Sequence, residues 1–219
     1  MKDLTFSDHP FHRDSDDNQK NISGIDEQTG SGISSRTLQA MNRFVITYTQ
    51  SGIIIIDQQN AHERILYEKF LSLPDDHRRD SQKQLLPISL NLRPSETELL
   101  KEYLDEFNKS GFEIAAFGKD SFIISAIPVG CSNENIAELF DKMLEKLQNN
   151  PVHHNSEKHQ QFVHGLAKTM SVSRGQKLQP EEQSALVENL FACKVPDITP
   201  DGKPTIFFIG FDELIKKFK

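Results

Sequence analysis

The sequence lacks the features that mark membrane, secreted and zinc-finger proteins. No apolar run approaches the roughly 20 residues that a membrane helix needs, and no signal-peptide pattern begins at Met1. The cysteines, Cys131 and Cys193, form neither a disulfide framework nor a zinc-ligand pattern. We therefore expect a cytoplasmic protein of a reducing compartment that has no membrane partner.

Basic residues are also too few for a nucleic-acid binder that acts alone. The chain has 25 Lys and Arg residues against 32 Asp and Glu residues, which gives a net charge of -7. It contains neither a Gly-rich phosphate loop nor a nucleophile elbow. These absences argue against the common nucleotide-binding and acyl-transfer classes and against a strongly basic nucleic-acid binder that acts alone.

Residues 1–32 are poor in apolar side chains and rich in Asp, Ser, Asn, Gly and His. Such a segment buries too little surface to offset the entropy of ordering it. We expect residues 1–32 to be a disordered linker and the chain to be a fragment of a longer protein.

From residue 33 onward the pattern predicts an α+β fold with two subdomains. Phe44 to Tyr48 alternates at strand spacing, and Ile53 to Ile56 reads as a strand buried on both faces. Residues 33–73 lack the partners to cover those isoleucines, so residues 155–219 are expected to supply them. This predicts a discontinuous subdomain of residues 33–73 and 155–219, with residues 74–154 inserted as an external α/β subdomain.

The stretch from Asp57 to Glu68 joins that isoleucine strand to a helix and carries two carboxylates near the helix start. It resembles the motif D-Q-H-A-x2-E-x4-E in the C-terminal domain of the DNA mismatch-repair protein MutL, where many members have endonuclease activity. The matching residues are Asp57, Gln58, Glu63 and Glu68, while Gln59 and Asn60 replace the histidine and alanine. The resemblance covers about residues 33–219 and implies the two-subdomain arrangement.

Two further family motifs are altered at their metal ligands. Thr199 to Thr205 is similar to C-P-H-G-R-P-T, with Thr199 in place of the cysteine and Asp201 in place of the histidine. Lys168 stands where the motif A-C-K has its cysteine. Threonine removes the soft thiolate that favours zinc, and a lysine cation opposes metal binding.

These replacements leave two interpretations of the carboxylates. In the favoured one, Asp57 and Glu63 cap and orient the junction, and the chain has no nuclease activity and no cofactor. In the alternative, the chain is a metal-dependent endonuclease that binds Mn2+ or Zn2+. Its metal ligands would be Asp57, Gln59, Glu63 and Asp201, with Asp57 and Glu63 catalytic.

Histidines gather at residues 153, 154, 159 and 164. His159 and His164 are five residues apart, which is not the i, i+4 pair of a helical zinc site. We expect these histidines to belong to a solvated helix start.

Residues 82–87 read Gln-x-x-Leu-x-Pro, similar to the segment by which the family contacts the replication sliding clamp. A glutamine anchor and apolar side chains in extended form suit a partner's groove, so Gln82, Leu85 and Pro87 are candidate clamp-binding residues. The structural alternative makes Leu85 and Leu86 the first core residues of the inserted subdomain.

The resemblance implies a homodimerisation module that holds two N-terminal ATPase domains in one molecule. The motifs of those ATPase domains do not occur in this sequence. We expect the dimer interface to use the apolar residues Ile54, Ile56, Ala192, Phe207 and Ile209. The implied partners are a second copy, the sliding clamp, the mismatch-recognition protein MutS, a helicase, and DNA through the full-length protein.

Overall fold

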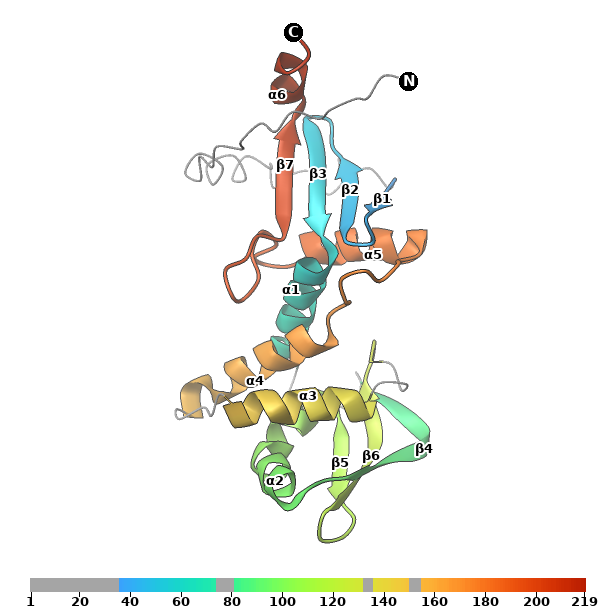
Figure 1. Ribbon diagram of the computed structural model, residues 1–219, viewed down its shortest axis with the longest axis vertical. Coiled ribbons are helices and arrows are strands. Elements are labelled where there is room, and N and C mark those ends of the chain that lie inside the picture. Colours follow the sequence, from blue (N-terminus) through green and yellow to red (C-terminus); the bar gives the residue numbers. More distant parts are fainter. Residues whose placement is uncertain (1–35, 74–80, 132–135, 150–154) are drawn as a thin grey trace, which may run out of the picture.

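Two antiparallel sheets organise the computed structural model, which describes residues 36–73, 81–131, 136–149 and 155–219. The predicted linker, residues 1–32, lies outside these ranges. One sheet lies toward each end of the molecule, with helices α1 and α4 between them (Figure 1). The strands are β1 (Leu38–Ala40), β2 (Phe44–Tyr48), β3 (Gly52–Asp57), β4 (Ser81–Asn91), β5 (Glu113–Ala116), β6 (Ser121–Pro128) and β7 (Ile206–Gly210).

Three of the helices begin where the sequence supplies a cap or a proline. Asp57 caps the first helix, and Pro94 and Pro180 occupy the first turns of two others, where a missing N–H has no cost. The helices are α1 (Gln58–Leu71), α2 (Pro94–Lys109), α3 (Ile136–Asn149), α4 (Asn155–Met170), α5 (Pro180–Phe191) and α6 (Phe211–Lys216).

The four-stranded sheet has the order β1-β2-β3-β7, so strands from distant parts of the chain meet in it. Strand β7 pairs antiparallel with β3 in the register Ile53 to Ile209 and Ile55 to Phe207. The segment around residue 206 therefore completes a sheet that begins at residue 38.

The three-stranded sheet has the order β4-β6-β5 and draws its strands from residues 81–128. Helices α2 and α3 supply its core with large aromatic residues such as Phe107 and Phe140, whose ring centroids lie 4.8 Å apart. This part of the chain has the predicted strand-helix-strand-strand-helix order.

Helix α1 connects the two hydrophobic cores. Its first turns place Ala61 against the four-stranded sheet, and its later turns place Leu66 and Phe70 in the core of the three-stranded sheet. Phe162 and Leu166 of α4 join that second core. Helices α1 and α4 therefore join the two halves through side-chain packing.

The mixture of helices and two sheets confirms the predicted α+β class. None of the helices in the described ranges has the length and apolar character to cross a bilayer. The expectation that Ile53 to Ile56 is buried on both faces is wrong within one protomer, because only Ile54 and Ile56 are buried.

Candidate functional site

Asp57 ends β3 and caps α1. Its Oδ1 accepts hydrogen bonds from the backbone N–H groups of Gln59 and Asn60, each at 3.1 Å. Its Oδ2 accepts one from Arg43 Nε at 3.1 Å. Both carboxylate oxygens are therefore engaged in fixing the turn from strand to helix.

Gln58, the neighbouring motif residue, is fully buried and ties three segments together. Its Nε2 lies 3.0 Å from the carbonyl oxygens of Asn42 and Gln176 and 3.3 Å from that of Ser173. Its Oε1 accepts a hydrogen bond from Gln39 Nε2 at 2.6 Å. The amide holds the junction against the backbone of residues 42 and 173–176 and is itself fully satisfied in its buried position.

Arg64 and Glu68 attach α1 to the loop that follows α5. Arg64 Nε donates to the carbonyl oxygen of Ile198 at 2.6 Å. The Glu68 carboxylate accepts from the backbone N–H groups of Lys194 and Val195 at 2.7 and 3.1 Å. The last glutamate of the motif therefore positions the loop that carries Asp201.

Glu63, His164 and Asp201 come together from α1, α4 and that loop. His164 Nε2 lies 3.3 Å from Glu63 Oε1 and 3.1 Å from Asp201 Oδ1. One potential ligand atom from each residue lies within 4.8 Å of the others, which is close enough to hold a metal ion. In the part of the chain that the structure describes, Asp57 does not belong to this group.

Lysine side chains already compensate the charge of Asp201. Its Oδ2 lies 2.7 Å from Lys168 Nζ and 3.5 Å from Lys203 Nζ. Burial alone would raise the pKa of Asp201, but the hydrogen bond from Lys168 and the charges of His164, Lys168 and Lys203 hold this pKa below its ordinary value. The same hydrogen bond raises the pKa of Lys168.

This donor set does not fit the metal that the family motif implies. The Lys168 ammonium group contacts one of the three candidate ligands, where a metal would bring its own positive charge. Thr199 offers no thiolate; it is buried, and its Oγ1 accepts from Lys203 N at 3.1 Å to close the turn. The site is an ion-paired network between two helices and a loop.

Sequence reasoning anticipated part of this arrangement. The structure brings Glu63, Asp201 and Lys168 together, but it leaves Asp57 and Gln59 at the helix cap. His164 was missed, and its assignment to a solvated helix start is wrong, because its ring lies against Tyr67 and contacts two carboxylates. A search for helical histidine pairs cannot detect a partner 101 residues away along the chain.

The four-stranded sheet has an apolar face that no helix of the described ranges buries. Its inner face contributes Val45, Ile54 and Ile56 to the core that also contains residues of α5. On its outer face, Tyr48 and Phe207 keep 46% and 49% of their surface exposed. Cross-strand pairs continue this outer face, which contains Phe44, Ile46, Tyr48, Ile53, Ile55, Phe207 and Ile209. We call these seven residues the open sheet face.

Two of the expected interface residues lie on the inner face of this sheet. Ile54 and Ile56 are 1% and 0% exposed because they face the protomer's own core. Strand residues alternate between faces, so the outward isoleucines are Ile53 and Ile55. Ala192 is the C-cap of α5, which packs on the inner face, whereas Phe207 and Ile209 do lie on the open sheet face.

The candidate clamp-binding segment protrudes from the three-stranded sheet. The pairing of β4 with β6 shifts between Lys83 and Ile88, so the intervening residues bulge out of the ladder. Leu85 and Leu86 are 100% and 84% exposed, and Gln82 and Pro87 are exposed as well. The alternative that Leu85 and Leu86 are core residues is therefore wrong.

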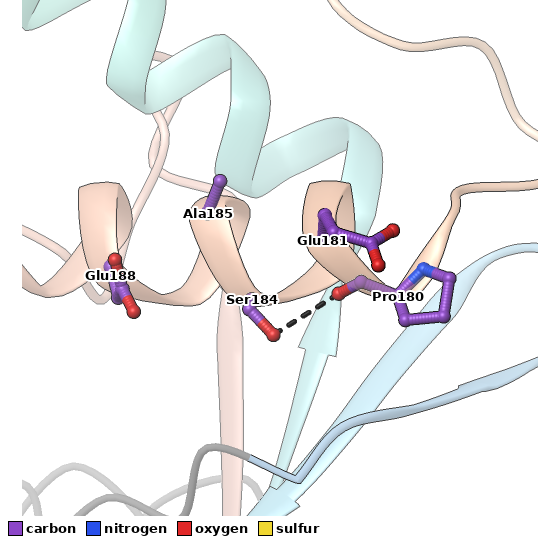
Figure 2. A pocket seen from close by; sticks show the side chains of 5 residues that line it. All are labelled: Pro180, Glu181, Ser184, Ala185 and Glu188. Atoms are coloured by element: carbon purple, nitrogen blue, oxygen red, sulfur yellow. Dashed lines mark hydrogen bonds between the residues drawn. The ribbon is translucent and has the colours of Figure 1, made fainter.

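A hollow on α5 is lined by Pro180, Glu181, Ser184, Ala185 and Glu188 (Figure 2). Ser184 Oγ donates to the carbonyl oxygen of Pro180 at 3.1 Å, so its hydroxyl is engaged within the helix. All five side chains come from one helix, and such a surface has no opposing wall to enclose a ligand.

A large apolar sheet face that the described helices leave exposed is typical of protein-binding modules, and this chain has the features of that class. The family model of the MutL C terminal dimerisation domain matches residues 37–178, and the chain belongs to this family. The DNA mismatch repair protein MutL of Flavobacterium psychrophilum is 34% identical over 182 residues, which are 83% of this chain and 30% of that protein. That of Phocaeicola vulgatus is 33% identical over 195 residues, 89% of this chain and 31% of that protein.

The chain spans about three tenths of the length of the curated relatives it matches. Membership of a dimerisation-domain family supports a homodimer, and the family's role in DNA mismatch repair agrees with the resemblance drawn from the motifs.

Proposed function

We propose that two copies of the chain associate through the open sheet face. The observation that carries this proposal is a continuous apolar surface on three paired strands, whose central pairs are Ile46 with Ile55 and Ile55 with Phe207. Covering such a face removes apolar area from water at roughly 25 cal/mol per Å². A second copy brings the same face, so a two-fold axis can bury both at once.

The function of this dimer is mechanical. In a longer protein of the length of the MutL relatives, it would hold two N-terminal ATPase halves in one molecule while they open and close around DNA. The share of the MutL relatives that this chain matches supports a module of this kind. On this proposal, residues 33–73 and 155–219 form the dimerisation subdomain and residues 74–154 an external one.

The test is gel filtration with light scattering on the wild type and Ile55→Asp. Ile55 lies at the centre of the open sheet face, so a carboxylate there should convert the dimer to a monomer. The matched control is Ile123→Asp, because Ile123 is also a half-buried strand residue but lies in the three-stranded sheet. If Ile55→Asp stays dimeric, or both variants dissociate equally, this interface is refuted.

We further propose that the bulge of β4 docks on the sliding clamp. Its support is the full exposure of Leu85, a large apolar side chain, on an edge strand of the described sheet. An extended segment at a sheet edge offers both backbone groups and side chains to a partner groove. Gln82 and Pro87 flank Leu85 and complete the Gln-x-x-Leu-x-Pro pattern.

Clamp docking is tested by surface plasmon resonance against the purified sliding clamp of the source organism. Leu85→Ala and Gln82→Ala should each weaken binding at least about tenfold without changing the unfolding midpoint, because both residues are exposed. Ser89→Ala, an exposed position further along β4, is the control and should bind like the wild type. Equal binding by all four proteins would exclude this segment.

We propose that the chain lacks nuclease activity, because ammonium groups neutralise Asp201. Metal-dependent nicking is the second candidate function. The short distances between the potential ligand atoms of Glu63, His164 and Asp201 favour it. Calorimetric titration of Mn2+ and Zn2+ separates the two. Saturable binding that Glu63→Gln abolishes would support the nuclease, whereas no heat of binding would support the ion-paired network.

A further inference from the structure

Helix α6 and the residues just after it carry an apolar stripe that the described part of the protomer covers only in part. Phe211, Leu214 and Ile215 of α6 and Phe218, two residues beyond its end, follow the spacing i, i+3, i+4, i+7 that is typical of one side of a helix, and Phe211 and Leu214 are half-buried. Ile215 is 52% exposed and Phe218 is 85% exposed, and no residue of α6 is buried.

The helix is anchored at its first residue and extends away from the rest of the molecule. Phe211 N donates to the carbonyl oxygen of Ser51 at 2.9 Å, which fixes the start of α6 at the turn between β2 and β3. From there it projects beyond the end of β7 (Figure 1). Neither hydrophobic core of the described chain includes a residue of α6.

A helix this short is unstable in water without packing. Nucleation is costly, and isolated helices below about 12 residues are marginal even with favourable sequences. Helix α6 has six residues. Its stability therefore depends on a surface that covers the stripe, and in the described part of the chain α6 contacts β7 and is bonded to the turn at Ser51.

The stripe follows the open sheet face directly along the chain. Ile209, the last apolar residue of that face, pairs with Ile53, and only Gly210 separates it from Phe211. Charges flank the stripe, with Asp212 and Glu213 in the first turn and Lys216 in the last. Both signs on one short helix suit the rim of an interface between identical surfaces, where each copy meets the other's charges.

We infer that α6 packs its apolar stripe on the second copy and extends the dimer interface beyond the sheet. This inference rests on the proposed dimer through the open sheet face. It adds that the order of α6 depends on the partner, so the helix forms together with the dimer.

The test measures the dimer dissociation constant by sedimentation in the wild type and in Ile215→Asp/Phe218→Asp. The double variant should raise the dissociation constant at least about tenfold, because it places two carboxylates in an apolar contact. The matched control is Lys217→Gln/Lys219→Gln, which changes the net charge equally but lies outside the stripe and outside α6. A second readout is amide hydrogen exchange of residues 213–218, which should be faster in the Ile55→Asp monomer.

Each outcome decides the inference. Weakened dimerisation in the stripe variant alone supports it, whereas equal dissociation constants in the stripe and control variants overturn it. Unchanged exchange of residues 213–218 in a monomeric Ile55→Asp also overturns it and leaves the sheet interface standing. If Ile55→Asp stays dimeric while the stripe variant dissociates, the sheet interface fails and the contact by α6 holds.

Discussion

Single residues at the junction of β3 and α1 act through their hydrogen bonds. Gln58 is the clearest case, because its buried amide lies within hydrogen-bonding distance of the carbonyl oxygens of Asn42, Ser173 and Gln176. Replacing Gln58 by Leu keeps the volume but removes the hydrogen bonds that the buried amide makes to these oxygens and to Gln39. We expect urea denaturation to show a loss of about 2–4 kcal/mol in the free energy of unfolding.

The control for this prediction is the adjacent Gln59→Leu. Gln59 is partly exposed and takes part in the helix cap through its backbone N–H, which leucine retains. Gln59→Leu should change the free energy of unfolding by no more than about 0.5 kcal/mol. A Gln58→Leu variant as stable as Gln59→Leu would contradict the role given to the buried amide.

His62 should make stability depend on pH. Burial, with a smaller effect of Lys69, lowers the pKa of His62 from 6.5 to about 4, and its Nδ1 accepts a hydrogen bond from Val172 N at 3.0 Å. The neutral ring is favoured in the folded state, so its stabilisation is complete above pH 6.5. It is lost as the pH falls toward 4 and amounts to at most about 3 kcal/mol.

The measurement is urea denaturation at pH 7 and pH 4.5 on the wild type and His62→Gln. Glutamine can accept the bond from Val172 but does not titrate. The wild type should lose more stability than the variant over this interval. Equal losses in the two proteins would show that His62 is not the titrating group.

Residue identity predicted Asp201 and Lys168 as neighbours of Glu63, but it did not predict His164. Asp201 and Lys168 occupy positions of two family motifs, and these motifs can still be recognised although their metal ligands are replaced. His164 joins the cluster because α4 packs against α1, which is a property of the fold and leaves no local spacing in the sequence. The ion-paired network could be identified only from the fold, which brings α1, α4 and the loop of Asp201 together.

At the scale of elements, the glycines of β3 and α4 have opposite roles. A Cβ at Gly52 would collide with the carbonyl oxygen of Ile209 and come within 2.6 Å of the Phe208 ring. We expect Gly52→Ala to lower the free energy of unfolding by about 3 kcal/mol, because β7 cannot then pair closely with β3.

Gly165→Ala should instead stabilise the protein. Gly165 lies inside α4, and an added Cβ would meet Met143 at 3.8 Å, an ordinary van der Waals distance. Alanine in a helix interior gains about 0.5–1 kcal/mol over glycine. Thermal unfolding should show a higher midpoint for Gly165→Ala, and a lower midpoint would mean that α4 and α3 pack more tightly than these distances imply.

Elements were predicted better than their faces. The four isoleucines predicted a strand, and Asp57 predicted the start of a helix. Because the isoleucines are identical, however, the sequence contains no alternation from which to assign sides, and a shift of one residue exchanges the faces. The bulge at Leu85 was equally hidden, because an apolar residue in a strand reads as core until its pairing is known.

At the scale of the whole molecule, dimerisation should stabilise the fold. Binding of a second copy to the folded state raises the midpoint of thermal unfolding as the protomer concentration rises. We expect this midpoint to increase between about 1 and 100 μM protein in the wild type and to stay constant in Ile55→Asp. If the midpoint rises equally with protein concentration in both proteins, the contact between copies lies outside the open sheet face.

Sedimentation equilibrium of the wild-type chain at micromolar concentration shows whether the chain is a self-associating module. We expect twice the protomer mass, with dissociation only on dilution. A single species of protomer mass up to about 100 μM would contradict self-association, because the open sheet face would then remain exposed to water in the isolated protein.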